Sequence, residues 1–174
     1  RMAFDICPVN VILNQFALKL GKNYDENGDF ARAGTVNFEI LTLLNTLPFY
    51  QSAPPKSLGI EWINEHVLPL LEGDHAENIL ATFTEHAAFQ IAEIFNQFKL
   101  KNVLFTGGGT YNSYLIERIK NKTSTAIIVP EKELIDFKEA LIFALMGTLR
   151  INNEINILSS ATGSSADHCS GILI

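Results

Sequence analysis

The chain has 174 residues, of which 47% are hydrophobic and 18% are charged, a composition that supplies a core and excludes an intrinsically disordered chain. Its 13 basic residues are scattered among 19 acidic ones, and the formal net charge of −6 argues against a nucleic-acid partner. No apolar run reaches the roughly 18 residues that a membrane span needs, so we expect no membrane partner either. The two cysteines, Cys7 and Cys169, lie far apart and are typical of reduced thiols in a cytoplasmic protein.

The first part of the chain predicts a short strand, a helix and a polar loop. Residues 3–6 have the pattern of a strand end, and residues 10–20 have apolar positions at helical spacing. The loop over residues 24–34 resembles the opening of a calcium-binding loop, but Phe30 stands where that loop requires glycine and Val36 where it requires glutamate. We therefore do not expect a calcium site.

The middle of the chain predicts three helices around a rigid loop. A short helix is expected over residues 37–45, and residues 51–59 form a loop whose consecutive prolines exclude a regular helix. Helices are then expected over residues 60–71 and 77–98. In the second of these, apolar residues recur every three or four positions over six turns, which predicts a buried stripe.

The last part predicts strands that alternate with helices. Strands are expected over residues 102–106 and 126–129, with helices over residues 113–120 and 134–150 and a surface tail from residue 155 onward. The pattern indicates an α/β fold with several helices packed on a small mixed sheet. Because few strands accompany many helices, we expect further sheet-forming sequence upstream of this chain.

The strongest local signal is a strand that runs into Gly107, Gly108 and Gly109 before a helix. Glycines let the backbone approach a ligand closely, and the helix N-terminus offers free N–H groups to an anion such as phosphate. A dinucleotide-binding fingerprint would need a third glycine at Asn112, and no Gly-Lys-Ser/Thr follows as in a Walker A loop. The alternative is a tight turn without a ligand.

Asp5 and Asn10 form a second candidate site. An aspartate at a strand end, five residues before a helix, can project its carboxylate into a cleft as a general base. Asn10 at the helix N-terminus could hold a substrate hydroxyl. The alternative for Asp5 is a capping or turn residue.

Three further residues are candidates for the lining of a cleft. The rigid loop displays Lys56 and Ser57, which suit an anionic or hydroxylated ligand, although such a segment is also common in loops without function. Glu139 is unusual because it lies on an otherwise apolar helix. The four histidines have no metal-ligand spacing between them, so no metal-binding residue is predicted.

The ordered set of motifs resembles the anhydro-N-acetylmuramic acid kinases over essentially the whole chain. The segments that carry the resemblance are Phe4-Asp5-x-x-Pro8-x-Asn10, Tyr24-Asp25 with Gly28, Ala31 and Gly34, Pro54-Pro55-Lys56-Ser57-x-Gly59-x-Glu61-Trp62, Thr106-Gly107-Gly108-Gly109 with Asn112, Glu139-Ala140, and Ala161-Thr162-Gly163. Each motif is weak by itself, but their order and spacing together are specific.

The resemblance implies one lobe of an actin/hexokinase-like (ribonuclease H-like) ATPase. Residues 1–174 would be the second, C-terminal lobe, with the N-terminal lobe and the first strands of this lobe absent. The implied activity is an ATP- and Mg²⁺-dependent kinase of peptidoglycan recycling that opens the 1,6-anhydro ring of the sugar with water and phosphorylates O6. The partners would be the sugar and the N-terminal lobe, and an exposed apolar edge would also permit a homodimer.

The resemblance also implies roles for individual residues. Asp5 would be the general base that activates water. The substrate-binding residues would be Asn10, Lys56, Ser57 and Glu139. The nucleotide would lie on Gly107, Gly108, Gly109 and Asn112.

The first motif departs from the family pattern, which leaves alternatives open. The family reads Phe-Asp-Thr-Gly-Pro-Gly-Asn there, whereas this chain has Ile6, Cys7 and Val9 in place of threonine and both glycines. A non-catalytic relative that keeps the actin-like lobe for binding or assembly is therefore an alternative, as is a related ATPase with another substrate. A chain of this length by itself is expected to be inactive, because the base and the phosphate clamp would come from different lobes.

Overall fold

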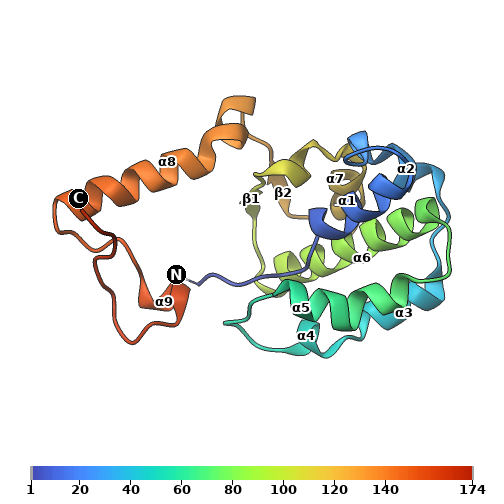
Figure 1. Cartoon of the computed structure of the whole chain (residues 1–174), viewed down its shortest axis with the longest axis horizontal. Helices are drawn as coiled ribbons and strands as arrows, with labels where there is room; N and C mark the ends of the chain where they lie inside the picture. The colour runs from blue at the N-terminus through green and yellow to red at the C-terminus, as the bar shows by residue number, and fades with distance from the viewer. Residues whose placement is uncertain (1, 174) are drawn as a thin grey trace.

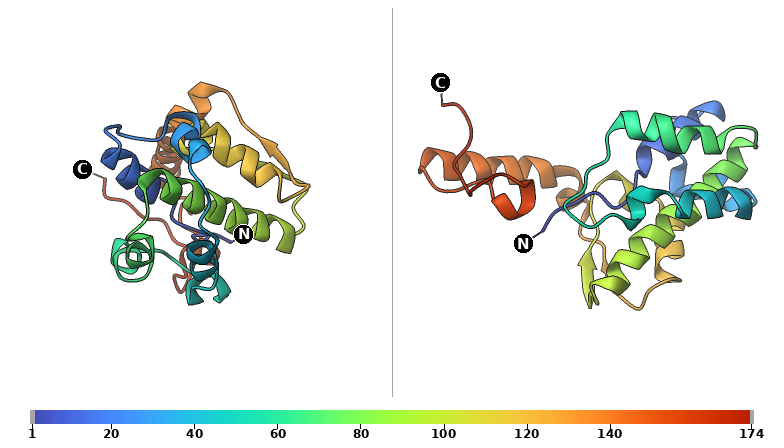
Figure 2. Two further views of the ribbon diagram at one scale, coloured as in Figure 1. Left: turned by 90° about the vertical axis from the view of Figure 1, so that its right-hand side faces the viewer. Right: turned by 90° about the horizontal axis from the view of Figure 1, so that it is seen from below.

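The structure is a computed structural model that describes residues 2–173. It consists of a mainly helical body and an arm that projects from it, as Figure 1 and the right-hand view of Figure 2 show. The arm is formed by α8 (Lys132–Ile151) and by the tail, which turns back along α8 and contains α9 (Ser159–Thr162).

The body is built from short helical elements around one long helix and a small sheet. Its helical elements are α1 (Asn10–Lys19), η1 (Glu26–Gly28), α2 (Asp29–Ala33), α3 (Phe38–Asn45), α4 (Pro48–Gln51), α5 (Ile60–Trp62), η2 (Ile63–Val67), η3 (Leu68–Leu71), α6 (Ala76–Gln97), η4 (Gly108–Tyr111) and α7 (Ser113–Lys120). Its strands are β1 (Asn102–Leu104) and β2 (Ala126–Ile128).

Helix α6 is the centre of the body because it carries two core clusters. Near its N-terminal end, Leu80 and Phe83 are fully buried against Ile12 of α1 and Leu44 of α3. Further along, α6 packs on α7 and on the inner face of the sheet through a second cluster that includes Ile91. The stripe of apolar residues predicted from the sequence is therefore the surface on which the other elements assemble.

The sheet is parallel, which corrects the expectation of a mixed sheet. In the described residues, β1 and β2 pair in register from Asn102 with Ala126 to Leu104 with Ile128. Residues 3–6, expected to be a strand, are not paired as one; their backbone is tied instead by the Asp5 N–H, which donates to the Lys56 carbonyl at 3.0 Å. A strand requires a ladder of partners, and residues 3–6 have no such ladder within residues 2–173.

The predicted helices are confirmed, whereas the single turns η1, α2, α4, η4 and α9 were not predicted as helices. The elements expected over 10–20, 37–45, 77–98, 113–120 and 134–150 end within two residues of the observed bounds. The turns η1 and α2 lie in the expected polar loop, and α4 begins at Pro48, a residue suited to the first turn of a helix. The expected helix 60–71 forms as three successive turns of different pitch.

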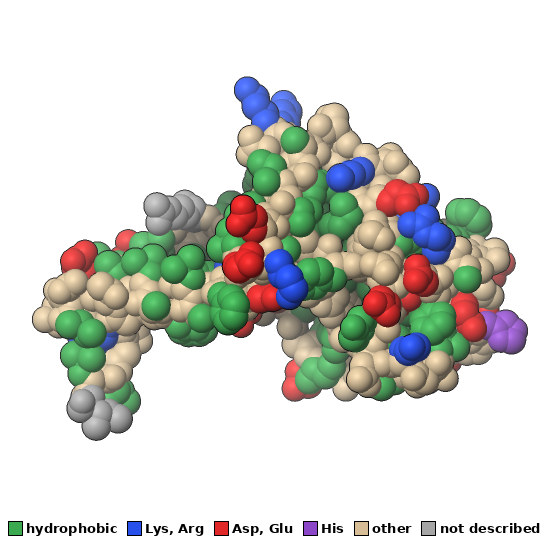
Figure 3. Space-filling view, turned by 90° about the horizontal axis from the view of Figure 1, so that it is seen from above, with side chains coloured by type: hydrophobic (Ala, Val, Ile, Leu, Met, Phe, Trp, Pro, Cys, Tyr) green, Lys and Arg blue, Asp and Glu red, His purple; other side chains and the backbone are tan. Residues whose placement is uncertain are grey.

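The arm leaves many apolar side chains in solvent. Of the described residues of α8, Ile135 is the buried one, whereas the Phe143 side chain is 69% exposed. Figure 3 shows hydrophobic side chains along this arm. The outer face of the sheet is similar, since Leu104 is 55% exposed. Among the described residues, no helix is both long enough and apolar enough to cross a membrane.

Candidate functional site

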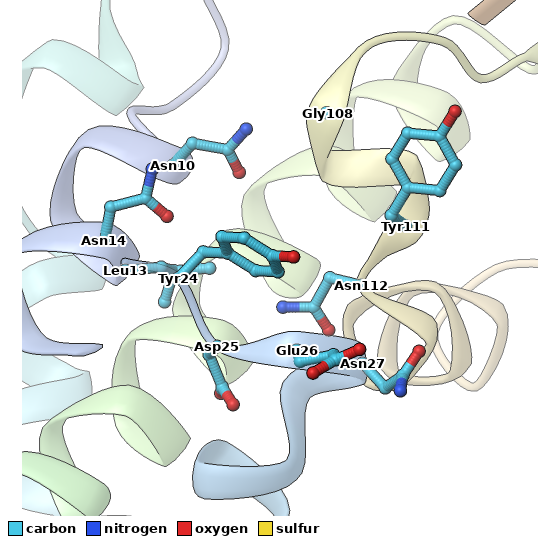
Figure 4. A pocket seen from close by; sticks show the side chains of 10 residues that line it. All are labelled: Asn10, Leu13, Asn14, Tyr24, Asp25, Glu26, Asn27, Gly108, Tyr111 and Asn112. Atoms are coloured by element: carbon cyan, nitrogen blue, oxygen red, sulfur yellow. The ribbon is translucent and has the colours of Figure 1, made fainter. Parts of the chain in front are cut away.

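A cavity of about 480 Å³ lies where α1, the 24–27 turn and the glycine segment meet (Figure 4). It is lined by Asn10, Leu13, Asn14, Tyr24, Asp25, Glu26, Asn27, Gly108, Tyr111 and Asn112. Most of these side chains are amides or aromatic rings, which can hydrogen-bond to and stack against a planar polar ligand. We call this space the glycine-loop cavity.

The glycine segment needs its glycines for two different reasons. Gly107 has a φ of 87°, a left-handed conformation that other residues adopt at an energetic cost. At Gly108, an added Cβ would lie 3.2 Å from the side-chain nitrogen of Asn10. The segment and Asn10 therefore contact each other where both line the cavity.

Asn112 serves the fold and faces the cavity at the same time. Its side-chain oxygen accepts a hydrogen bond from the Leu115 N–H at 2.9 Å and thereby caps α7. In Figure 4 its amide nitrogen points toward Tyr24, across the cavity. The N-terminus of α7, which the sequence offered as an anion site, is therefore partly satisfied by this cap, and the side-chain nitrogen remains as a donor toward a ligand.

Asp25 has a structural partner that explains its place in the polar loop. Its two carboxylate oxygens accept hydrogen bonds from the N–H groups of Phe30 and Ala31, at 2.8 and 3.0 Å. Burial raises the pKa of Asp25 despite these two hydrogen bonds. The carboxylate thus fixes the start of α2 and the wall of the cavity rather than acting as an open ligand.

Asp5 lines a second cavity of about 570 Å³, which lies between residues 4–8 and the β1 strand up to Thr106. One carboxylate oxygen, Oδ2, accepts hydrogen bonds from the Leu58 N–H at 2.7 Å and from the Ser57 hydroxyl at 3.2 Å. No hydrogen bond from the described residues reaches its other oxygen, Oδ1. The carboxylate is therefore oriented by one oxygen and open at the other, and we call this space the Asp5 cavity.

The two cavities lie at neighbouring points of the same two segments. One wall runs from Asp5 to Asn10, and the other runs from β1 through Thr106 to Gly108. The structure thus brings together Asp5 with Ser57, and Asn10 with Gly108 and Asn112. It places the two groups of predicted residues in adjoining cavities rather than in one.

Two predicted residues lie away from both cavities. The Lys56 ammonium donates to the carbonyl oxygens of Phe49 and Tyr50, at 3.0 and 3.5 Å, and burial lowers its pKa. Glu139 is exposed on the arm and lines neither cavity. Their roles toward a substrate stay predictions.

Sequence reasoning did not single out Lys138 or Tyr111, and it named Tyr24 in a family motif without placing it in a site. The Lys138 ammonium donates to the Thr106 hydroxyl at 2.9 Å and brings a positive charge beside the glycine segment. Tyr24 and Tyr111 line the glycine-loop cavity with their rings. The sequence pointed to Lys138 only as a basic residue next to Glu139. Its contact with Thr106, 32 residues away, depends on the direction in which α8 leaves the body.

The described residues contain no group of three or more histidine, cysteine, aspartate or glutamate side chains that could hold a metal ion. A Mg²⁺ ion that accompanies ATP needs only one or two carboxylates besides phosphate oxygens and water. In this chain the Asp25 carboxylate is already engaged with α2. We therefore assign no residue of the chain to magnesium.

The comparisons with known proteins agree on one family. The family model described as anhydro-N-acetylmuramic acid kinase matches residues 1–174. A protein of that name from Francisella tularensis subsp. novicida (strain U112) is 33% identical over 176 residues, which cover 94% of this chain and 46% of that protein. One from Bacillus cereus (strain AH820) is 33% identical over 177 residues, with 93% and 46% covered.

The chain spans about half the length of the curated relatives that it matches. The family implies an actin-like ATPase fold, of which the described residues form a helical part with a small parallel sheet. The match extends over the Asp5 segment, the 54–59 loop and the glycine segment alike. The chain belongs to the anhydro-N-acetylmuramic acid kinase family.

Proposed function

We propose that this chain is one lobe of an ATP-dependent kinase that opens the 1,6-anhydro ring of anhydro-N-acetylmuramic acid with water and phosphorylates O6. The observation that carries the proposal is the Asp5 carboxylate, held through Oδ2 by Ser57 and Leu58 and open at Oδ1 in a cavity. A general base needs this combination of fixed orientation and a free acceptor. Family membership supplies the substrate and the nucleotide.

The proposed chemistry begins with proton transfer at Asp5. Oδ1 takes a proton from a water molecule while the water oxygen attacks the anomeric carbon of the sugar. The bond from that carbon to O6 breaks, and O6 attacks the γ-phosphorus of ATP, so that ADP leaves. The residues of this chain orient the water and the sugar, which is the main task of a protein in phosphoryl transfer.

The glycine-loop cavity is the proposed nucleotide site. Tyr24 and Tyr111 offer rings for stacking, and the Asn112 side-chain nitrogen offers a donor. The backbone at Gly107–Gly109 leaves room for phosphate oxygens, and Lys138 lies near enough to add a positive charge. ATP would thus lie in the cavity that adjoins the Asp5 cavity, with its phosphates toward the sugar.

A second candidate function is a binding or assembly module without catalysis. It is favoured by Ile6, Cys7 and Val9, which replace threonine and two glycines of the family pattern. These side chains pack against the second core cluster, and none of the three has a positive φ. Burial also raises the pKa of the Cys7 thiol, so it is a packing residue rather than a reactive one. The changes therefore introduce no backbone strain near Asp5, and the kinase remains the first proposal.

The test is a coupled ADP assay on the full-length protein with anhydro-N-acetylmuramic acid and Mg²⁺-ATP. We expect sugar-dependent ADP release that falls by a factor on the order of 10² to 10⁴ in Asp5→Asn, since a general base contributes about that much. The variant Asn64→Asp makes the opposite change of charge at an exposed residue that lines neither cavity, so it should leave ADP release unchanged and serves as the control. A folded protein that binds the sugar without releasing ADP would instead support the binding module.

The isolated 174-residue chain is the second arm of this experiment. We expect no sugar-dependent ADP release from it, because the chain covers only about half of its relatives' length. Sugar-dependent release by this chain alone would overturn the proposal that it is one lobe of a two-lobed kinase.

A further inference from the structure

The orientation of Asp5 depends on one short loop. The segment from residue 2 to residue 9 has no helix or strand of its own. Three hydrogen bonds hold Asp5 in this segment. Its N–H donates to the Lys56 carbonyl, and its Oδ2 accepts from the Ser57 hydroxyl and from the Leu58 N–H. All three partners are consecutive residues, so a shift of residues 56–58 would move the carboxylate.

That loop is closed onto the C-terminal end of α4. The Lys56 ammonium donates to the carbonyl oxygens of Phe49 and Tyr50. It also lies 4.6 Å from the centroid of the Phe49 ring, a cation–π contact. The position of residues 56–58 is therefore tied to α4, a helix of four residues that has little stability of its own.

A buried hydrogen-bond chain fixes α4 to the long helix α6. The Tyr50 hydroxyl lies 2.8 Å from His86 Nε2, and His86 Nδ1 lies 2.7 Å from the side-chain oxygen of Asn45. That oxygen can only accept, and Gln90 donates to it as well, at 3.2 Å. His86 Nδ1 therefore carries the proton, and Nε2 accepts from the Tyr50 hydroxyl. Burial raises the pKa of Tyr50, which keeps the proton on that hydroxyl.

We propose that Tyr50 is a positioning residue, which holds the Asp5 carboxylate in place through α4 and residues 56–58. This inference rests on the proposed function, in which Asp5 is the general base. Tyr50 does not line the Asp5 cavity, so it acts through the residues that it contacts, which are Lys56 of the loop and Cys7 of the Asp5 segment, and not by touching the sugar. The hydroxyl is placed by His86, whose side chain is fully buried in α6, the most extensively packed element of the body.

The first test is Tyr50→Phe in the full-length protein, which removes one hydroxyl and keeps the ring. We expect kcat for sugar-dependent ADP release to fall by about tenfold, while KM for the sugar and for ATP stays within about twofold. Small displacements of a catalytic group have effects of this size or larger. A role in stability alone would lower the melting temperature and leave kcat unchanged at temperatures well below it.

The matched control is Thr82→Val, on α6, the helix that carries His86. Thr82 is fully buried, and its hydroxyl accepts from the Asn37 N–H at 2.9 Å, but its contacts lead to α3 and not to the Asp5 loop. We expect a similar loss of thermal stability without the loss of kcat. Equal losses of kcat in Tyr50→Phe and Thr82→Val would overturn the inference, because the loss would then follow the removal of any buried hydroxyl and not the link from Tyr50 to Asp5.

A double-mutant cycle separates this inference from the proposed function. Tyr50→Phe alone is expected to lower kcat. If Tyr50 acts only through Asp5, adding Tyr50→Phe to Asp5→Asn leaves the residual kcat of Asp5→Asn unchanged. Additive losses would show that Tyr50 acts elsewhere and overturn the inference. If Asp5→Asn keeps full activity, the proposed function itself fails; if only Tyr50→Phe keeps full activity, the positioning role alone fails.

Discussion

His86 illustrates how one buried residue sets the response of the protein to acid. Its ring lies between Asn45 and Tyr50, and burial lowers its pKa from 6.5 to about 3. Between these two pH values the unfolded chain binds a proton that the folded protein does not. The contribution to stability is therefore present above pH 6.5 and is lost as the pH falls toward 3.

This linkage predicts a weaker fold in mild acid. Between pH 6.5 and 5.0 the free energy of unfolding should fall by about 2 kcal/mol, at about 1.4 kcal/mol for each pH unit. Urea unfolding of the full-length protein at the two pH values measures this change. In His86→Gln the free energy of unfolding should change less with pH over this range. In His66→Gln, which replaces an exposed histidine, its pH dependence should persist. An unchanged slope in His86→Gln would contradict the assignment.

At the scale of single elements, two asparagine caps offer a matched comparison. Asn112 caps α7 and faces the glycine-loop cavity, whereas Asn37 caps α3 through the N–H groups of Glu39 and Ile40 and does not line that cavity. A cap of this kind stabilises a helix by about 1 kcal/mol. The two residues therefore separate the cost of a lost cap from the cost of a lost ligand contact.

We predict that Asn112→Asp weakens ATP binding about tenfold without loss of thermal stability. The carboxylate keeps the oxygen that caps α7, removes the side-chain donor and adds a negative charge, and a hydrogen bond is worth about 1 kcal/mol. Asn37→Ala should lower the free energy of unfolding by about 1 kcal/mol and leave ATP affinity unchanged. Calorimetric titration with ATP and thermal unfolding measure both quantities. Unchanged ATP affinity in Asn112→Asp would remove Asn112 from the nucleotide site.

At the scale of the whole molecule, the outer face of the sheet and the arm lack the cover that such surfaces normally have. Parallel strands are usually buried on both faces, yet Leu104 on β1 and Phe143 on α8 lie mostly in solvent. The relatives have about as much sequence again outside the region that this chain matches. We therefore propose that this surface is covered in the full-length protein by sequence that lies outside the chain.

This proposal predicts that the isolated chain self-associates. Sedimentation velocity should show an average mass that rises with concentration, because exposed apolar patches of this kind promote association. The double substitution Leu141→Glu and Phe143→Glu on α8 should reduce the association. The control Thr148→Glu adds a charge at an exposed polar position of the same helix and should not.

The same substitutions should destabilise the full-length protein, although they improve the behaviour of the isolated chain. If the surface is covered there, Leu141→Glu with Phe143→Glu buries two charges and should lower the free energy of unfolding by several kcal/mol. A clean monomer of the isolated chain at all concentrations, together with an unaffected full-length variant, would contradict the proposal.

The sequence by itself determined the long elements and the strand–glycine–helix turn. Helix α6 and helix α7 are encoded by apolar residues at helical spacing, and the turn at Gly107 by residues that need no distant partner. The family could also be inferred from the order of short motifs. These features depend on neighbours within a few positions along the chain, which is the range over which a sequence pattern carries information.

The tertiary structure alone decided which side chains meet. Asp5 accepts hydrogen bonds from residues 52 and 53 positions away, and Asn10 lies against Gly108, which is far from it along the chain. The sequence offered Lys56 as a ligand for the substrate, but the fold turns its ammonium onto α4. Such pairings follow from how α1, α4 and β1 pack around α6, because a side chain's contacts depend on the elements that surround it and not on its own neighbours in sequence.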